Sequence, residues 1–519
     1  MKNNDINNSN VKVKSRQIAA ALLITCASLC CSCSDWLNIT PEDTVSADEL
    51  FSTYSGYHTA LNGIYQELAS NKLYGREFTW GFASALSQCY SNNNEPNVEK
   101  RYTYTERYEY NTNEVEGYTA DIWLTGYNVI ANINNLLQHL EKADKNLFPG
   151  VLEYEVELIR GEALALRAMM HFDLLRLFAP APIEGNNTAG IPYNDQFPNK
   201  FAERLPVKDA LQKIIADLEE ACDQLKRYEG ESTAREKYLT NWTLRYSQGI
   251  DGIMPFFLGR GTRLNYVAAQ TLLARVYLYA GNQSAAQEVA QTVRTRYVAP
   301  LNNIAASENF CYLVATNPAW NSSDIRSYPH KLMQETLFGL YNVKLASNYE
   351  DLVSSSRNAF ALKNVEQVYG NDISDVRYGK LIYEENPGAK GEDLIHRSLK
   401  YNVTNNASAL ENSMIPVIRI SELQFITLEC LSATDLPKAV DELNKFRKSV
   451  RGCTVDIVAD TREDFLIALS KEIKREYACE GAHYFFFCKQ HRLPVNDGLT
   501  DINLSSKYTL PIPQNEISL

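Results

Sequence analysis

The stretch RGEALALRAMMHFDLLRLF, residues 160–178, decides the fold class of this chain. Apolar side chains recur through it at the 3.6-residue period of an α-helix, and alanine and leucine are strong helix formers. The segment Ala179-Pro180-Ala181-Pro182 follows directly, and proline cannot continue a helix. We therefore predict a helix that runs from Glu153 to Phe178.

The same period predicts that most of the chain is helical. A first helix is expected at 47–69, with Ser46 as its cap and Tyr65 on its apolar stripe. Further helices are expected at about 120–140, 206–227 and 462–478. Tyrosines alternate with other residues in one segment, which instead suggests a strand or hairpin there: Tyr102, Tyr104, Tyr108 and Tyr110.

Two segments have the pattern of antiparallel helix pairs. In Ala269–Thr295, small residues flank the turn Gly281-Asn282, as in a tetratricopeptide (TPR) repeat, where two helices pack closely. A looser unit spans Pro416–Val450. Residues 298–415 show little period and are too long for one loop, so they are interpreted as an irregular insertion. The predicted fold is mostly α, a TPR-like helix-pair scaffold with an irregular, loop-rich lobe.

Residues 1–32 are typical of a lipoprotein signal peptide. A basic segment precedes an apolar run at 18–29 that is too short to span a membrane as a stable anchor. Ser32 is the small residue that such a cleavage site needs before the lipidated cysteine. We predict lipidation of Cys33, by acyl chains such as palmitate, and a soluble domain over 33–519. Cys31 and Cys26 are alternatives, as is a plain cleaved signal with incidental cysteines.

Composition and motifs restrict the function. The net charge of −12 disfavours binding of nucleic acid or anionic lipid, whereas 31 tyrosines and 5 tryptophans suit stacking on sugar rings. The chain has no HExxH, GxSxG or P-loop motif, and its cysteines form no CxxC pair beyond the leader. We predict no catalytic residue, no cofactor and no metal, although carboxylates that meet only in the fold would leave glycoside hydrolysis open.

Several stretches together resemble one family, the SusD/RagB family of outer-membrane nutrient-binding lipoproteins. The mature start, Cys33-Ser34-Asp35-Trp36-Leu37, is similar to the family's amino terminus. Residues 160–178 resemble its "AEARFLRA…YFDLVRLFG" helix. Residues 475–481, REYACEG, resemble "RRxELxxEG", and residues 510–517, LPIPQNEI, resemble "PIPxxEI". These stretches occur in the expected order from position 33 to 517.

The resemblance implies a location and partners. It implies a lipid-anchored protein of the cell outer membrane, exposed at the surface. It also implies a non-enzymatic role, in which the protein captures an oligosaccharide or polysaccharide. The captured glycan would be delivered to a SusC-like TonB-dependent outer-membrane transporter, over which the lipoprotein sits as a lid.

Glycan capture needs aromatic platforms beside polar side chains, and loops on a rigid scaffold are the usual place for them. Two segments fit, 78–95 and 309–328. The candidate ligand-binding residues in them are Trp80, Tyr90, Asn93, Trp320 and Arg326. Core packing is the alternative role for the tryptophans.

Two other functions remain open from the residues. A lipid-anchored TPR scaffold could bind a protein or peptide, but a pure repeat array would not need the aromatic-rich insertion. The second of these alternative functions is a lipid-anchored glycan hydrolase, and the absence of a catalytic motif is the argument against it.

Overall fold

The computed structural model describes residues 46–91, 98–148, 152–199, 202–241, 244–247, 254–298, 310–317, 320, 328–355, 359–385, 394–402 and 409–514. The chain divides into two units, residues 1–53 and 54–519. The described part of the first unit contains helix α2 (Ala47–Leu50). The Ser46 hydroxyl caps it by accepting from the Glu49 backbone N–H at 3.2 Å. All other elements belong to the second unit.

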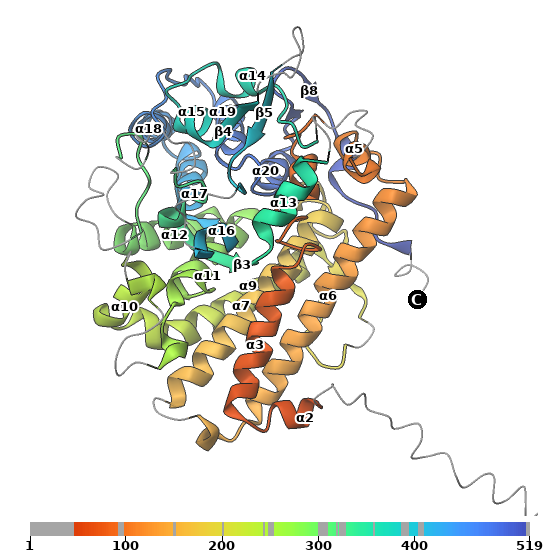
Figure 1. The fold of residues 1–519 in the computed structure, drawn as a ribbon, viewed down its shortest axis with the longest axis vertical. Coiled ribbons are helices and arrows are strands. Elements are labelled where there is room, and N and C mark those ends of the chain that lie inside the picture. The colour runs from red at the N-terminus through yellow and green to blue at the C-terminus, as the bar shows by residue number, and fades with distance from the viewer. Residues whose placement is uncertain are drawn as a thin grey trace, which may run out of the picture. The chain divides into compact units, whose positions relative to one another are not determined.

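Four long helices form the first part of the second unit (Figure 1). They are α3 (Tyr54–Leu68), α6 (Asn113–Glu141), α7 (Leu152–Phe178) and α9 (Val207–Leu225). Helix α7 packs against both α6 and α9, and α3 packs against α6. Every residue of α7 from Gly161 to Phe178 is buried, so this helix lies inside the core, and the charged residues among them, such as Glu162, are buried with it.

Helix pairs continue this series. The first pair is α11 (Tyr266–Tyr279) and α12 (Gln283–Tyr297), and the second is α17 (Ile420–Ser432) and α18 (Leu436–Lys445). Gly281 adopts a φ of +87° at the first turn, a conformation that favours glycine, and Asn282 caps α12. Helix α9 packs against α11, and α12 packs against α17. The two helix pairs predicted around these turns are present.

Short elements make up the remainder. The second unit has α4 (Phe82–Leu86), α5 (Lys100–Glu106), α8 (Pro182–Gly185), α10 (Thr233–Thr240), α13 (Leu345–Val353), α14 (Val365–Tyr369), α15 (Val376–Leu381), α16 (Ala409–Ser413), α19 (Arg462–Glu476) and α20 (His483–His491). Its strands are β1 (Ala189–Pro192), β2 (Arg204–Pro206), β3 (Thr336–Tyr341), β4 (Ile382–Glu385), β5 (Ile395–Ser398), β6 (Met414–Arg419), β7 (Val495–Asn496) and β8 (Asp501–Ile502).

The described strands pair as four antiparallel two-stranded sheets, β1–β2, β3–β6, β4–β5 and β7–β8. In the pair that matters for the site, Thr336 lies opposite Arg419 and Tyr341 opposite Met414. The predominantly helical fold class is confirmed, and the predicted irregular insertion contains short helices and strands rather than one loop. No helix in the described ranges combines the length and apolar character that crossing a bilayer requires.

Three local predictions are corrected. The tyrosine-rich segment is not a strand: Tyr102 and Tyr104 lie in helix α5, and Tyr108 and Tyr110 follow its end. Tyr102 is buried with its hydroxyl 3.0 Å from Glu77 Oε1, and this packing overrides the alternation. The helix expected at 47–69 is interrupted at residues 51–53, between α2 and α3. Helix α20 follows α19 and was not expected.

A buried cluster of charges joins the lobe to the helix pairs. At its centre is the Glu476 carboxylate in α19, which is 1% exposed. Oε1 of Glu476 accepts from Arg419 Nη1 and Arg451 Nη2, both at 2.7 Å. Oε2 accepts from Arg451 Nε at 3.0 Å and from Arg377 Nη1 at 3.1 Å. These three arginines come from the end of β6, from the segment after α18 and from α15, so one carboxylate fixes three distant parts of the chain.

The cluster depends on the charged form of its acids. Burial by itself raises the pKa of Glu476, but the guanidinium groups of Arg451, Arg419 and Arg377 outweigh it and hold the pKa well below its usual range. Glu472, one turn earlier in α19, has its pKa lowered to about 2, since Arg377 and Arg447 outweigh its burial.

We predict that Glu476→Gln lowers the free energy of unfolding by about 3–5 kcal/mol at neutral pH, because three guanidinium groups lose their common counter-charge. Urea unfolding measures this. Glu442→Gln, which removes one of the two carboxylate partners of the exposed Lys445, is the control and should lower the free energy of unfolding far less. Equal losses in the two variants would contradict the central role of Glu476.

The pH dependence of stability follows from the same shifts. A carboxyl whose folded pKa lies below its ordinary value of 4.5 stabilises the fold above that pH. We therefore expect the wild-type free energy of unfolding to fall as the pH is lowered from about 4.5 towards 2, and its advantage over Glu476→Gln to shrink over that range.

Candidate functional site

The core helix α7 positions the candidate site through one buried carboxylate, that of Glu162. Gly161 lets α7 approach α9 closely, since a Cβ there would lie 2.7 Å from Leu225 Cγ. Glu162 is completely buried. It accepts hydrogen bonds from the Tyr65 hydroxyl at 2.6 Å and from Arg263 Nε at 2.8 Å through Oε2, and from Arg260 Nη2 at 2.8 Å through Oε1.

The charged state of Glu162 is maintained by these partners. Burial by itself raises the pKa of Glu162, but the guanidinium groups of Arg263 and Arg260 outweigh that effect, and the net pKa is lowered. The carboxylate therefore holds Tyr65 of α3 and Arg263 of the loop before α11 in fixed positions.

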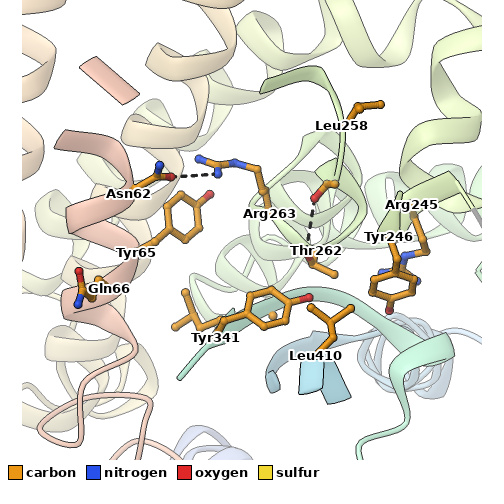
Figure 2. Close-up of a pocket in the computed structure, with 13 residues that line it drawn as sticks. Asn62, Tyr65, Gln66, Arg245, Tyr246, Leu258, Thr262, Arg263, Tyr341 and Leu410 are labelled. Carbon is orange, nitrogen blue, oxygen red and sulfur yellow. Dashed lines mark hydrogen bonds between the residues drawn. The ribbon is translucent and has the colours of Figure 1, made fainter. Parts of the chain in front are cut away.

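Tyr65 and Arg263 line a pocket of about 520 Å³, which is the candidate functional site. Figure 2 shows side chains of α3 on one side and the turn Leu244–Tyr246 on the other. The pocket is lined by Asn62, Tyr65, Gln66, Arg245, Tyr246, Leu258, Gly259, Thr262, Arg263, Gly339, Leu340, Tyr341 and Leu410. These residues come from distant parts of the sequence.

The α3 side of the pocket is polar and aromatic. Asn62, Tyr65 and Gln66 share one face because residues three and four apart in a helix are neighbours. The Arg263 guanidinium lies 4.5 Å from the centre of the Tyr65 ring. Arg263 Nη1 also donates to Asn62 Oδ1 at 3.4 Å, so the amide at the exposed rim of the pocket is oriented by the same arginine (Figure 2).

The opposite side carries a second arginine. Arg245 is 1% exposed, and its Nη2 donates to the carbonyl oxygens of Gly261, at 2.6 Å, and of Thr336. Its guanidinium lies between the rings of Tyr246 and Phe310, 4.9 and 4.0 Å from their centres. Gly261 is required here, since a Cβ would clash with the Arg245 side chain. Burial lowers the pKa of Arg245.

Two tyrosines complete the wall. Tyr341, the last residue of β3, and Tyr246 both line the pocket, and Tyr246 donates to the Met333 carbonyl at 2.9 Å. Burial raises the pKa of both hydroxyls, which therefore stay protonated. The pocket thus combines aromatic rings with amide, guanidinium and hydroxyl groups, the set that hydrogen-bonds and stacks on a polyhydroxylated ring.

The pocket has no features of a catalytic or metal site in the described chain. None of its lining residues is an aspartate or glutamate, so it lacks the carboxylate pair that glycoside hydrolysis uses. The described ranges also contain no group of three or more His, Cys, Asp or Glu side chains arranged to hold a metal ion.

The interpretation of Trp80 and Tyr90 as ligand-stacking residues is corrected by their burial. Trp80 is 0% exposed, and its ring makes edge contacts with Tyr349 and Phe360, with centres 5.1 and 5.7 Å away. Its indole N–H donates to the Gly75 carbonyl at 3.2 Å. Tyr90 is 1% exposed and donates to the Trp80 carbonyl at 2.6 Å. Neither ring offers a face to a ligand.

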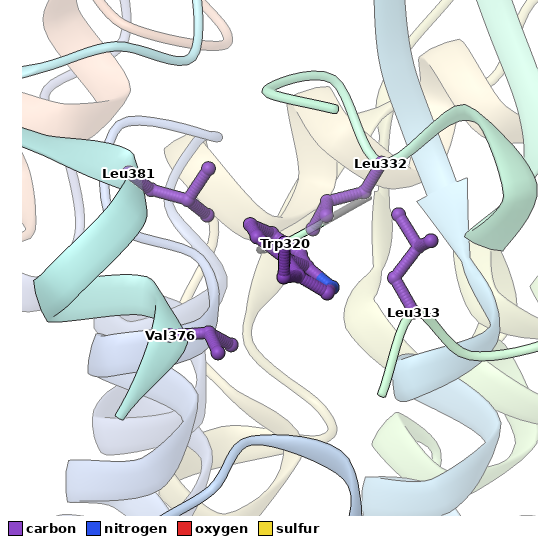
Figure 3. Packing of buried hydrophobic residues seen from close by; sticks show 5 residues of the cluster. All are labelled: Leu313, Trp320, Leu332, Val376 and Leu381. Atoms are coloured by element: carbon purple, nitrogen blue, oxygen red, sulfur yellow. The ribbon is translucent and has the colours of Figure 1, made fainter. Parts of the chain in front are cut away.

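Trp320 is corrected in the same way. Figure 3 shows its ring at the centre of a small apolar core in the lobe, and it is 1% exposed. The side chains around it are Leu313, Leu332, Val376 and Leu381. Asn93, Arg326 and Cys33 lie outside the described residues, so their predicted roles remain predictions.

Sequence reasoning missed the residues that line the pocket. Tyr65 was assigned to the apolar stripe of its helix, which its half-buried ring fits. The segment Gly259-Arg260-Gly261 matches no motif in the sequence, yet Arg260 pairs with Glu162 and Gly261 accommodates Arg245. No local signal unites residues 62, 245, 263 and 341.

Helix pairs, an irregular lobe and a polar, aromatic pocket define a helical binding scaffold. A family model described as SusD-like, starch-binding associating with outer membrane, matches residues 35–242. A SusD-like protein of Formosa agariphila is 23% identical over 521 residues, which cover 94% of this chain and 95% of that protein. Together with the motifs in the expected order, these matches support the resemblance to the SusD/RagB family.

Solved structures share the fold. A SusD superfamily protein from Bacteroides thetaiotaomicron matches with a TM-score of 0.63 and 21% identity, covering 90% of this chain and 98% of that one. A SusD-like carbohydrate-binding protein from Bacteroides vulgatus matches with a TM-score of 0.63 and 16% identity, covering 90% and 96%. At such identities, the likeness concerns the fold and not the individual site residues.

We predict that Glu162→Gln lowers the free energy of unfolding by about 3–5 kcal/mol, because Arg260 and Arg263 lose a buried counter-charge. Glu157→Gln, on the same helix and paired with the exposed Arg227, should cost less than about 1 kcal/mol. Urea unfolding of both variants measures the difference. A loss at Glu162 no larger than that at Glu157 would refute the positioning role of Glu162.

Proposed function

We propose that this protein is a cell-surface lipoprotein that captures an oligosaccharide or polysaccharide and delivers it to a TonB-dependent outer-membrane transporter. The observation that carries the proposal is the pocket between α3 and β3, in which tyrosine rings lie beside amide and guanidinium donors. The family model's description as starch-binding and associated with the outer membrane supports the same role.

The chemistry of the lining matches a sugar. A pyranose ring has apolar C–H faces that pack on aromatic rings and hydroxyl groups that need hydrogen-bond partners at its edge. Tyr65 and Tyr341 supply rings, and Asn62, Gln66 and Arg263 supply the polar groups. Since Glu162 already fixes Tyr65 and Arg263, little side-chain entropy is lost when a ligand binds.

Binding without turnover is favoured over hydrolysis because no carboxylate lines the pocket in the described chain. A TPR scaffold that binds a protein or peptide is the other alternative, and the small-molecule dimensions of the pocket argue against it. Asn93 and Arg326 remain predicted ligand contacts beyond the described residues.

The anchor completes the proposal. Residues 1–32 would be removed as a signal peptide, Cys33 would carry the lipid, and residues 33–519 would form the surface domain. The lipid-bearing end would hold the domain against the outer membrane, beside a SusC-like transporter.

We expect the purified chain from Ser34 onward to bind a specific glycan on an array of plant, microbial and host glycans. Tyr341→Ala should weaken that binding about tenfold, equivalent to about 1.4 kcal/mol, because the sugar loses a ring to pack on. Isothermal titration with the best array hit measures the change.

Tyr383→Ala is the matched control, since Tyr383 is exposed in β4 and lies outside the pocket lining. It should leave affinity unchanged. Binding lost equally in both variants would place the site elsewhere. A chain that binds no glycan, or that releases reducing ends from its ligand, would refute the proposal.

The anchor and the partner are tested together in one membrane preparation. Wild-type protein should fractionate with the outer membrane and co-purify with a TonB-dependent transporter. Cys33→Ala should be found in the soluble fraction, because a single cysteine carries all the acyl chains. Cys31→Ala is the control and should stay membrane-bound. A Cys33→Ala protein that remains in the membrane would overturn the assignment of the anchor.

A further inference from the structure

The pocket is positively charged in an acidic protein. The whole chain has a net charge of −12, yet the lining holds two arginines and, among the described residues, no carboxylate. Charges that line a cleft with low-dielectric walls act strongly on a bound ligand. The positive charge of the pocket lining therefore affects which class of ligand it binds.

The two arginines differ in how their charges are balanced. Arg263 donates to Glu162 Oε2 at 2.8 Å, so a buried carboxylate compensates it. Arg245 donates only to carbonyl oxygens, those of Gly261 and Thr336, and its Nε has no hydrogen-bond partner in the described chain. Carbonyl dipoles orient a guanidinium, but they do not neutralise it.

Arg245 differs from the other fully buried arginines in having no carboxylate partner among the described residues. Arg260, Arg419 and Arg451 are each about 1% exposed, as is Arg245. Each of those three has a carboxylate within 3.1 Å. An isolated buried charge is costly, and an uncompensated one needs an anion from another source.

An acidic residue next to the pocket lining has a lysine, not Arg245, as its ionic neighbour. Glu411 follows the lining residue Leu410, and burial raises its pKa, with the charge of Lys331 acting against that rise. The electrostatic neighbours of Arg245 are Tyr246, Tyr341 and Cys311, none of which is charged at neutral pH.

We propose that the ligand of this pocket is an anionic glycan, whose carboxylate or sulfate group is bound beside Arg245. This inference rests on the proposed function and names the class of sugar. The anionic group would face the Arg245 guanidinium, with the hydroxyl of Tyr341 as a further donor, while the ring packs towards Tyr65. Uronic acids and sulfated sugars share this chemistry.

The test uses matched pairs of ligands that differ only in charge. Oligogalacturonide is compared with its methyl-esterified form, and a sulfated galactan oligosaccharide with its desulfated form, by isothermal titration with the mature chain. One charged form should bind at least ten times more tightly than its neutral partner. That ratio should shrink as salt is raised from about 50 to 300 mM, because ionic attraction is screened.

A charge-adding variant locates the interaction. Gln66 is exposed at the rim of the pocket, so Gln66→Glu should fold normally and weaken the charged ligand at least tenfold more than the neutral one. Gln291→Glu makes the same change at an exposed position of α12 outside the lining and should have no such effect. Arg245→Gln should abolish the preference for charge, with circular dichroism confirming that it folds.

The outcomes separate the two proposals. The anionic assignment is overturned if charged and neutral forms bind equally well. It is also overturned if the preference for the charged form is unchanged in Gln66→Glu. In both cases the proposed capture of a glycan is unaffected. A protein that binds only neutral glycans would likewise contradict the anionic assignment but not the proposed capture of a glycan. Absence of binding to any glycan on the array refutes the proposed function, and the anionic assignment with it.

Discussion

The Glu476 carboxylate, buried and surrounded by three guanidinium groups, is the group on which the rest of the structure depends. Its partners arrive from α15, from the end of β6 and from the segment after α18. A buried charge is tolerated only when several partners compensate it, so the three segments must assemble together. Glu335, next to the start of β3, shares two of the same arginines, Arg419 and Arg451. The irregular lobe is thereby fixed to the helix pairs.

The walls of the pocket connect to this cluster and to a second one. Strand β3 starts beside Glu335 and ends at Tyr341, so the first cluster fixes one wall of the pocket. The second cluster, around Glu162 of α7, fixes Tyr65 and Arg263 on the other wall. Buried charge pairs add little net stability compared with apolar packing, but they restrict geometry. In this chain, the two clusters hold the pocket walls in place rather than contributing extra stability to the core.

The sequence predicted what depends on local periodicity. The bounds of α7 and the pairs α11–α12 and α17–α18 follow from apolar spacing and from turn residues such as Gly281. The predictions from sequence were wrong where tertiary contacts determine the secondary structure or the burial of a side chain. Tyr102 and Tyr104 lie in a helix, because the buried contact of the Tyr102 hydroxyl with Glu77 outweighs a weak β preference. Trp80 and Trp320 are in loops by pattern, yet both are buried. A sequence gives the identity of an aromatic residue, but not which neighbours cover its faces.

The pocket could not be assembled from the sequence for the same reason, since Asn62, Arg245 and Tyr341 meet only in three dimensions. The ligand preference of the pocket is inferred from a difference between Arg245 and the other buried arginines. Elsewhere a fully buried guanidinium contacts a carboxylate, whereas Arg245 is held by two carbonyl groups and lines a cavity. The neighbouring rings, carbonyls and Gly261 hold its side chain in place before any ligand arrives. A charge that is already desolvated and oriented costs little to reorganise on binding, so an anionic group beside it would keep most of its attraction to the guanidinium.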